Sequence, residues 1–214
     1  MGLDPDSLLT TTRAVRRRLD FERAVPRALV EECLEIALQA PNGSNMNSWR
    51  WLAIDDRARI ARAAEIYRDA MRDQIAHPSL PYRQDPASMP RHPQLMASAR
   101  HLAENLHRSP VLVVPLLEGR LEGADLFVSA SMWASIIPAI WSFMLALRAR
   151  GLGSCWTTVH LLREREMAEL LGIDASQYTQ AGLFPVAWTL GSEFRRAWRR
   201  PLREVLSWNG VEAR

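Results

Sequence analysis

Two arginine-bearing segments stand near opposite ends of this sequence of 214 residues. The first is TRAVRRR, from Thr12 to Arg18, and the second contains Arg199 and Arg200. A guanidinium group presents a planar fork of N–H donors that matches the oxygens of a phosphate. If the fold brings the two segments together, we expect them to bind a compact anion such as a phosphate group.

A polar loop lies between a predicted helix and a predicted strand. Residues 40–51 read APNGSNMNSWRW, whereas a plain connection needs only a few turn residues. The loop is either only a long polar connection, or its residues are arranged to bind a ligand. Flavin mononucleotide (FMN) needs cations for its phosphate, amide or backbone groups for the edge of its ring, and a cation near ring atoms N1 and O2. Together the three segments suggest FMN, while each alone is more typical of a solvated surface.

Three other kinds of chemistry have weaker support. GLGSCW, from Gly151 to Trp156, lacks the third glycine of a dinucleotide fingerprint and follows a predicted helix where the fingerprint follows a strand, so Gly151 is better explained as a helix C-cap. No G-x-S-x-G motif is present, and Cys33 falls on the apolar face of a predicted helix. The histidines are not spaced as metal ligands, so we expect no metal site; they are His77, His92, His101, His107 and His160.

The composition predicts one folded domain over residues 1–214. Apolar residues make up 48% and charged residues 24%, which excludes a largely disordered chain. All 27 basic residues are arginine, but outside the two segments they are scattered, so a nucleic-acid interface is not expected. Cys33 and Cys155 do not form a disulfide framework, and residues 1–12 lack the apolar core of a signal peptide. We therefore expect a cytoplasmic protein.

The stretch from Leu126 to Leu147 contains no charged residue and is long enough to cross a membrane. Its serines and Pro138 favour instead a helix buried in the core or in a subunit interface, so we expect no membrane association.

Hydrophobic periodicity and turn residues predict a mixture of helices and strands without regular alternation, which indicates an α+β fold. The proline-rich segment 77–93 is predicted to be an irregular cover over a site. The predicted helices are 7–18, 26–40, 57–76, 94–107, 126–150 and 164–171, and the predicted strands are 49–54, 110–117 and 183–190, with a turn into a strand at 151–159.

Three stretches resemble the nitroreductase family of FMN-dependent oxidoreductases. The opening, TTRAVRRRLDFERAVPRALVEECLEIALQAPNGSNMNSWRW, resembles the family's arginine-rich start and its A-P-S-x-x-N-x-Q-P-W loop. WSFMLALRARGLGSCWTT resembles its long central helix and G-L-G-x-x-W segment, and RRPLREV resembles its C-terminal motif. The similarity runs from about residue 10 to residue 206 and is closest to an actinobacterial branch. It implies a central, mostly antiparallel sheet flanked by helices, in an interwoven homodimer with a long buried central helix.

The resemblance also implies roles for individual residues. Arg16 matches the cation near N1 and O2 of the flavin. Ser44, Asn45 and Asn47 match a loop that reaches the FMN from the partner subunit. The remaining matches are Thr12, Arg13 and Ala14 beside the phosphate and ribityl chain, Thr157 and Thr158 beside the ring, and Arg199 on the phosphate.

Several positions depart from the family pattern. Thr12 replaces an arginine, and Ala14 replaces a serine whose hydroxyl contacts the phosphate. Asn47 and Ser48 replace glutamine and proline, which shortens the reach of the amide, and Ala197 replaces a cation. These departures predict weaker FMN binding than in a relative with the complete pattern.

By resemblance, NAD(P)H reduces the flavin, and a nitroaromatic or quinone-type acceptor then reoxidises it in a ping-pong reaction. The flavin carries the chemistry, and Arg16 stabilises the charge of the reduced ring. One alternative is a protein that binds FMN without catalysis. Another is flavin fragmentation, whose branch resembles this chain at Met46 and Trp49 but has an aspartate where Ala14 stands. The physiological acceptor and the choice between NADH and NADPH stay open.

Overall fold

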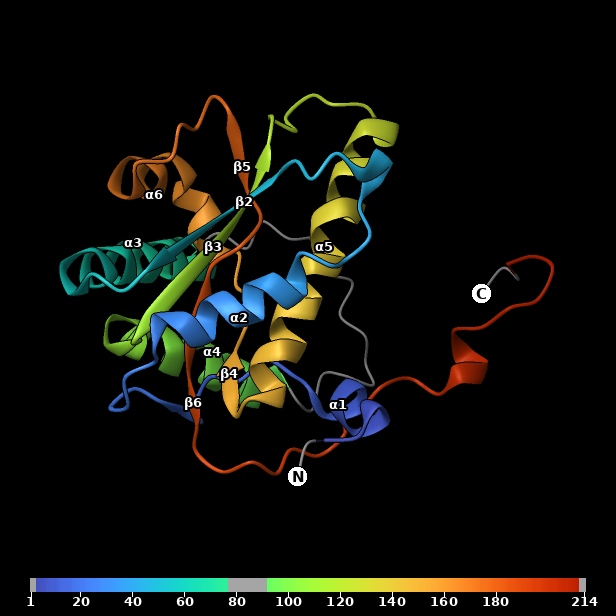
Figure 1. Cartoon of the computed structure of the whole chain (residues 1–214), viewed down its shortest axis with the longest axis horizontal. Helices are drawn as coiled ribbons and strands as arrows, with labels where there is room; N and C mark the ends of the chain where they lie inside the picture. The colour runs from blue at the N-terminus through green and yellow to red at the C-terminus, as the bar shows by residue number, and fades with distance from the viewer. Residues whose placement is uncertain (1–2, 77–91, 212–214) are drawn as a thin grey trace.

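The structure is a computed structural model that describes residues 3–76 and 92–211. Its six α-helices lie around one sheet (Figure 1). The helices are α1 (Pro5–Thr11), α2 (Arg27–Ala37), α3 (Arg57–Ala76), α4 (His92–Asn105), α5 (Leu126–Ala149) and α6 (Glu164–Leu171). Short 3-10 turns are η1 (Gly43–Asn45), η3 (Leu106–Arg108), η4 (Val159–Arg163) and η5 (Leu202–Glu204).

Every strand pair in the described sheet is antiparallel, which confirms the predicted sheet. The order is β1-β6-β3-β2, with β4 paired to β6 and β5 paired to β3. The strands are β1 (Leu19–Asp20), β2 (Trp49–Ile54), β3 (Val111–Glu118), β4 (Leu152–Ser154), β5 (Tyr178–Gln180) and β6 (Phe184–Thr189).

The central strand β3 divides the core into two layers. Successive side chains of a strand point to opposite faces, and β3 is buried on both. Leu112, Val114 and Leu116 join the cluster under α3, α4 and α6. On the other face Val111 and Val113 join the cluster under α2 and α5. Helices therefore cover both faces of the sheet (Figure 1).

Helix α5 is the one described helix that is long and apolar enough to cross a membrane. Ile136, Ile140 and Phe143 on it are fully buried against α2 and the sheet. The beginning of the helix, by contrast, exposes Leu126 and Phe127. The predicted core helix is thus confirmed for its second half, while its first turns present apolar side chains on the surface of the single chain.

The first predicted helix, 7–18, is wrong beyond Thr11, because α1 ends there. Thr12 already has extended backbone angles. The backbone N–H of Val15 donates to the carbonyl of Ser154 at 2.8 Å, and the Val15 side chain is buried. A helix through residues 13–18 would lose both interactions, so tertiary contacts override the local helix propensity.

Candidate functional site

Val15 and β4 position the N-terminal arginine segment. Gly153 in β4 lies where this segment crosses, and a Cβ atom at that position would stand 2.6 Å from Cγ2 of Thr189 and 3.2 Å from Cβ of Val15. The second glycine of GLGSCW therefore permits a close approach of two chain segments. Gly151 directly follows Arg150, the C-cap residue of α5, and its φ of 78° is the left-handed conformation in which a glycine ends a helix. The predicted role of Gly151 at the helix end is confirmed, one residue beyond the cap itself.

Replacing Gly153 by alanine is expected to lower the free energy of unfolding by about 1–3 kcal/mol, because the added methyl group overpacks a buried strand. Chemical denaturation of the purified variant measures the change. Gly210→Ala is the matched control, since no atom lies within 4 Å of a Cβ placed there. Equal stability of the two variants would contradict the close-packing role of Gly153.

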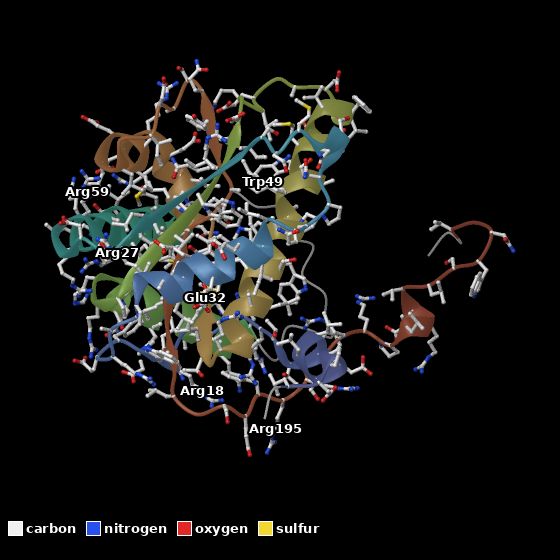
Figure 2. All side chains as sticks on the ribbon, in the orientation of Figure 1. Arg18, Arg27, Glu32, Trp49, Arg59 and Arg195 are labelled. Atoms are coloured by element: carbon white, nitrogen blue, oxygen red, sulfur yellow. The ribbon has the colours of Figure 1, made fainter. Side chains whose placement is uncertain are left out.

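The C-terminal segment returns to the N-terminal arginines after β6. The backbone N–H of Leu190 donates to the carbonyl of Arg18 at 2.8 Å, and Nη1 of Arg13 donates to the carbonyl of Arg195 at 3.1 Å. Figure 2 shows Arg18 and Arg195 at the same end of the molecule, near α1 and the chain that follows β6. Two segments that lie far apart in sequence therefore meet, as the arginine chemistry requires.

An open hollow of about 980 Å³ lies at this meeting place. Arg13 and Arg16 line it from one segment, and Arg199 and Arg200 line it from the other. Its described lining contains no carboxylate and also includes Ala14, His92, Gln94, Leu95, Ser98, Arg196, Ala197, Trp198 and Val205. Guanidinium groups such as those of Arg13, Arg16 and Arg199 suit an anionic ligand, and the volume is that of a small-molecule or cofactor site.

Thr12 lies in a neighbouring hollow of about 310 Å³, together with Arg13 and Arg199. Its hydroxyl donates to the carbonyl of Leu8 at 2.7 Å. A threonine hydroxyl has one hydrogen to donate, so in this conformation Thr12 cannot also donate to a phosphate. Thr12 therefore does not compensate for the hydroxyl that is missing at Ala14.

Arg16 is half-buried and extends from the hollow towards the protein interior. Its guanidinium is close enough to the Cys155 thiol to oppose the effect of burial on that group, although burial prevails and raises the pKa of Cys155 to about 12. The thiol therefore stays neutral and is inert at physiological pH. Arg16 is thus placed between the hollow and the strand segment that leads to Thr157.

Thr157 and Thr158, the two residues expected beside the ring, lie outside both of these hollows. Thr157 is buried, and its hydroxyl donates to the carbonyl of Leu183 at 2.8 Å. Thr158 is exposed and precedes η4. The structure thus gives Thr157 a role in holding the sheet together and leaves only Thr158 accessible.

The amide loop is at the other end of the molecule from the hollow. Trp49, which follows it, lies far from Arg18 and Arg195 in Figure 2. The N–H of Gly43 donates to Oγ of Ser135 at 2.9 Å, which fixes the loop on the first half of α5. Within one chain, therefore, the loop and the arginines do not form a common site.

Much of the polar character of this loop serves its own conformation. The Asn47 N–H donates to Oδ1 of Asn42 at 2.9 Å, and Nδ2 of Asn47 donates to the carbonyl of Asn45 at 3.0 Å. Ser44, Asn45 and Asn47 all have φ values between 51° and 53°, a conformation that favours asparagine over most residues. Ser44, Asn45 and Asn47 are all exposed, but the Asn47 amide already bonds within the loop through both its oxygen and its nitrogen.

One wall of the hollow was not predicted from the sequence. His92, Gln94, Leu95 and Ser98 come from the first half of α4, which directly follows the proline-rich segment. The predicted cover, 77–93, lies outside the described residues except for its last two positions, which begin α4. The polar residues that follow the predicted cover are the sequence signal from which the contribution of α4 to the hollow could have been predicted.

His160 follows the two threonines and is fully buried. Burial lowers its pKa to about 4, against smaller opposing effects of Glu164 and Gln180. In the unfolded chain its pKa is near 6.5, so the unfolded state binds more protons between these two values.

Stability is therefore expected to fall as pH drops from about 6.5 to about 4, by on the order of 2 kcal/mol from this residue. Denaturation curves of the wild type and of His160→Gln across this pH range measure the effect. A difference in stability between the two proteins that does not change with pH would contradict it.

The chain is similar to known proteins in both sequence and structure. The sequence model of the nitroreductase family matches residues 9–188, so the chain belongs to the nitroreductase family. No match was found among curated proteins. The actinobacterial branch stays a prediction.

Solved structures share the fold at low sequence identity. A BluB-like flavoprotein from Clostridium difficile 630 has a TM-score of 0.72 at 18% identity, covering 98% of this chain and 100% of that one. The FMN- and NADPH-dependent nitroreductase NfnB from Sphigopyxis sp. strain HMH has a TM-score of 0.69 at 20% identity, covering 98% and 100%. Oxidised iodotyrosine deiodinase bound to FMN and 3-iodo-L-tyrosine has a TM-score of 0.68 at 19% identity, covering 97% and 99%.

Proposed function

We propose that this protein is an FMN-dependent oxidoreductase that uses NAD(P)H to reduce a nitroaromatic or quinone-type acceptor. The observation that carries the proposal is the meeting of Arg13 and Arg16 with Arg199 around one hollow whose described lining contains no carboxylate. Membership of the nitroreductase family supports it, as does the FMN named for two of the similar structures.

The donor set of the hollow fits FMN at its phosphate end. Arg13 and Arg199 would hold the phosphate, since both line the large hollow and the smaller one beside Thr12. Ala14 offers its backbone and no side-chain donor. Arg16, the half-buried member, would place a positive charge near the N1 and O2 edge of the ring. When bound, FMN supplies the transfer of a hydride from NAD(P)H and of electrons to the acceptor.

We further propose that the protein is a single-domain, cytoplasmic homodimer. Proteins of the nitroreductase family are generally dimeric. The C-terminal arm, residues 195–211, lines the hollow with its first residues and then extends away from the body of the chain (Figure 1). Its outer part exposes Leu202, Val205, Leu206, Trp208 and Val211. Such a row of apolar side chains is typical of a segment that packs on another subunit. A second copy would also bring Ser44 and Asn45 to a hollow that they do not reach within one chain.

Steady-state assays with the FMN-loaded protein test the activity. Oxidation of NADH and of NADPH is followed separately with menadione, a quinone, and with nitrofurazone, a nitroaromatic. The proposal predicts acceptor-dependent oxidation of at least one nicotinamide with parallel lines in double-reciprocal plots, as ping-pong kinetics require. FMN-loaded protein that oxidises neither nicotinamide would instead support the alternative of FMN binding without catalysis.

A further inference from the structure

Two arginines contact the ring of Phe194, which directly precedes the C-terminal arm. The guanidinium carbon of Arg18 lies 4.2 Å from the ring centroid, and that of Arg148 lies 4.6 Å from it. Arg18 comes from the N-terminal segment and Arg148 from the last turn of α5. We call Arg18, Arg148 and Phe194 the Phe194 clamp.

Arg148 is unusual because it is a buried cation without a carboxylate partner among the described residues. Its Nη2 donates to the carbonyl of Ser192 at 2.6 Å. The C-terminal end of α5 and the face of the Phe194 ring also favour a positive charge there. A buried charge is costly to retain. Outside its own helix, the described contacts that offset this cost are to Ser192 and Phe194, which lie just before the arm.

Arg18 holds the same stretch from another side. Its Nε donates to the carbonyl of Leu190, and its Nη1 donates to the carbonyl of Glu193, each at 2.7 Å. Between them Gly191 has a φ of 76°, and a Cβ atom there would lie 2.6 Å from Nη2 of Arg18. The backbone from Leu190 to Phe194 is therefore folded closely around guanidinium groups.

We infer that Arg148 and Phe194 are positioning residues that direct the C-terminal arm so that Arg199 reaches the phosphate of the flavin. Phe194 lies five residues before Arg199, and the next fixed point is the Arg195 carbonyl, which accepts from Arg13. Residues 196–200 then line the hollow, and the arm extends away from the body of the chain after them (Figure 1). Neither Arg148 nor Phe194 lines the large hollow. Phe194 lines a smaller hollow of about 390 Å³ beside it, together with Arg13 and Arg16, and Arg148 lines neither hollow. We therefore infer that both residues act through the arm. The inference rests on the proposed binding of FMN.

FMN and riboflavin differ only in the phosphate, so their affinities separate positioning of the phosphate from general stability. Fluorescence titration of apoprotein with each flavin gives the two dissociation constants. In Arg148→Met and Phe194→Ala we expect the FMN dissociation constant to rise at least about tenfold, the effect of losing one charge-assisted hydrogen bond, with that of riboflavin almost unchanged. Phe194→Trp keeps an aromatic face and should restore the FMN affinity.

The matched control is Arg23→Met. Arg23 lies 3.6 Å from the ring centroid of Trp188 and so makes the same kind of contact away from the arm. The Arg23→Met variant should bind FMN and riboflavin with unchanged affinities. Arg148→Met is expected to fold, because an apolar residue of similar size often replaces a buried charge without loss of stability.

Each outcome decides the question. If FMN and riboflavin weaken by the same factor, or if neither weakens, the clamp only supports the fold and the inference is overturned. If the wild-type protein binds neither flavin, the proposed function fails first. Selective loss of FMN affinity with rescue by Phe194→Trp supports the positioning role.

Discussion

Replacing Arg13 and Arg199 together by alanine is expected to weaken FMN binding by about 10²–10³-fold, because each guanidinium contributes a charge-assisted hydrogen bond to the phosphate. The two residues lie 186 positions apart in sequence, yet both line the same two hollows. Riboflavin, which has no phosphate, should bind the variant nearly as well as the wild type. Isothermal titration calorimetry with both flavins measures the two affinities.

Arg59→Ala is the control for the change in charge. Arg59 is exposed on α3, and Figure 2 shows it on a different side of the molecule from Arg18 and Arg195. Its variant should bind FMN like the wild type. A double variant with unchanged FMN affinity would remove Arg13 and Arg199 from the phosphate site, and an equal loss for riboflavin would assign them to the fold instead.

Replacing Arg16 by alanine is expected to slow reduction of the bound flavin by NAD(P)H by about 10²-fold, because a positioned cation stabilises the negative charge that develops on the ring. FMN should still bind, since Arg13 and Arg199 remain. Stopped-flow absorbance of the FMN-loaded variant under anaerobic conditions measures this rate directly.

Arg17→Ala removes the same charge from the adjacent position. Arg17 is exposed and lines a smaller hollow of about 390 Å³ but not the large one. Its variant should reduce the flavin at the wild-type rate. If Arg16→Ala and Arg17→Ala react equally fast, Arg16 has no electrostatic role at the ring.

Local signals were sufficient for the regular elements. The predicted strand 49–54 and the predicted helix 57–76 have the bounds of β2 and α3. The start of α3 could be predicted because Asp56 is a typical N-cap residue. Its side chain accepts a hydrogen bond from the backbone N–H of Arg59 at 2.8 Å. The predicted helix 164–171 likewise has the bounds of α6, which Gly172 ends with a φ of 68°.

Elements that depend on distant partners could not be predicted in this way. The arginine segment is extended because Val15 pairs with Ser154, a contact between residues that are remote in sequence. The short strands β1 and β5 were missed for the same reason. β5 has only three residues, and its pairing with the end of β3 defines it. Two or three residues carry too little periodicity to reveal a strand.

The candidate site shows the same limit. Guanidinium chemistry suggested a phosphate ligand, but only the family resemblance indicated that the two ends of the chain would meet. The contribution of α4 was missed because Gln94 and Ser98 look like ordinary surface residues in sequence. The amide loop attracted attention for its polarity, yet Asn42 and Asn47 use their amides mainly on each other.

The visible spectrum of the purified protein, recorded before and after denaturation, shows whether this chain binds FMN. We expect the two absorption bands of an oxidised flavin, and release on denaturation of a yellow compound that chromatography and mass spectrometry identify as FMN. Protein purified without colour should acquire the same spectrum when FMN is added. A colourless protein that takes up no added FMN would contradict the account.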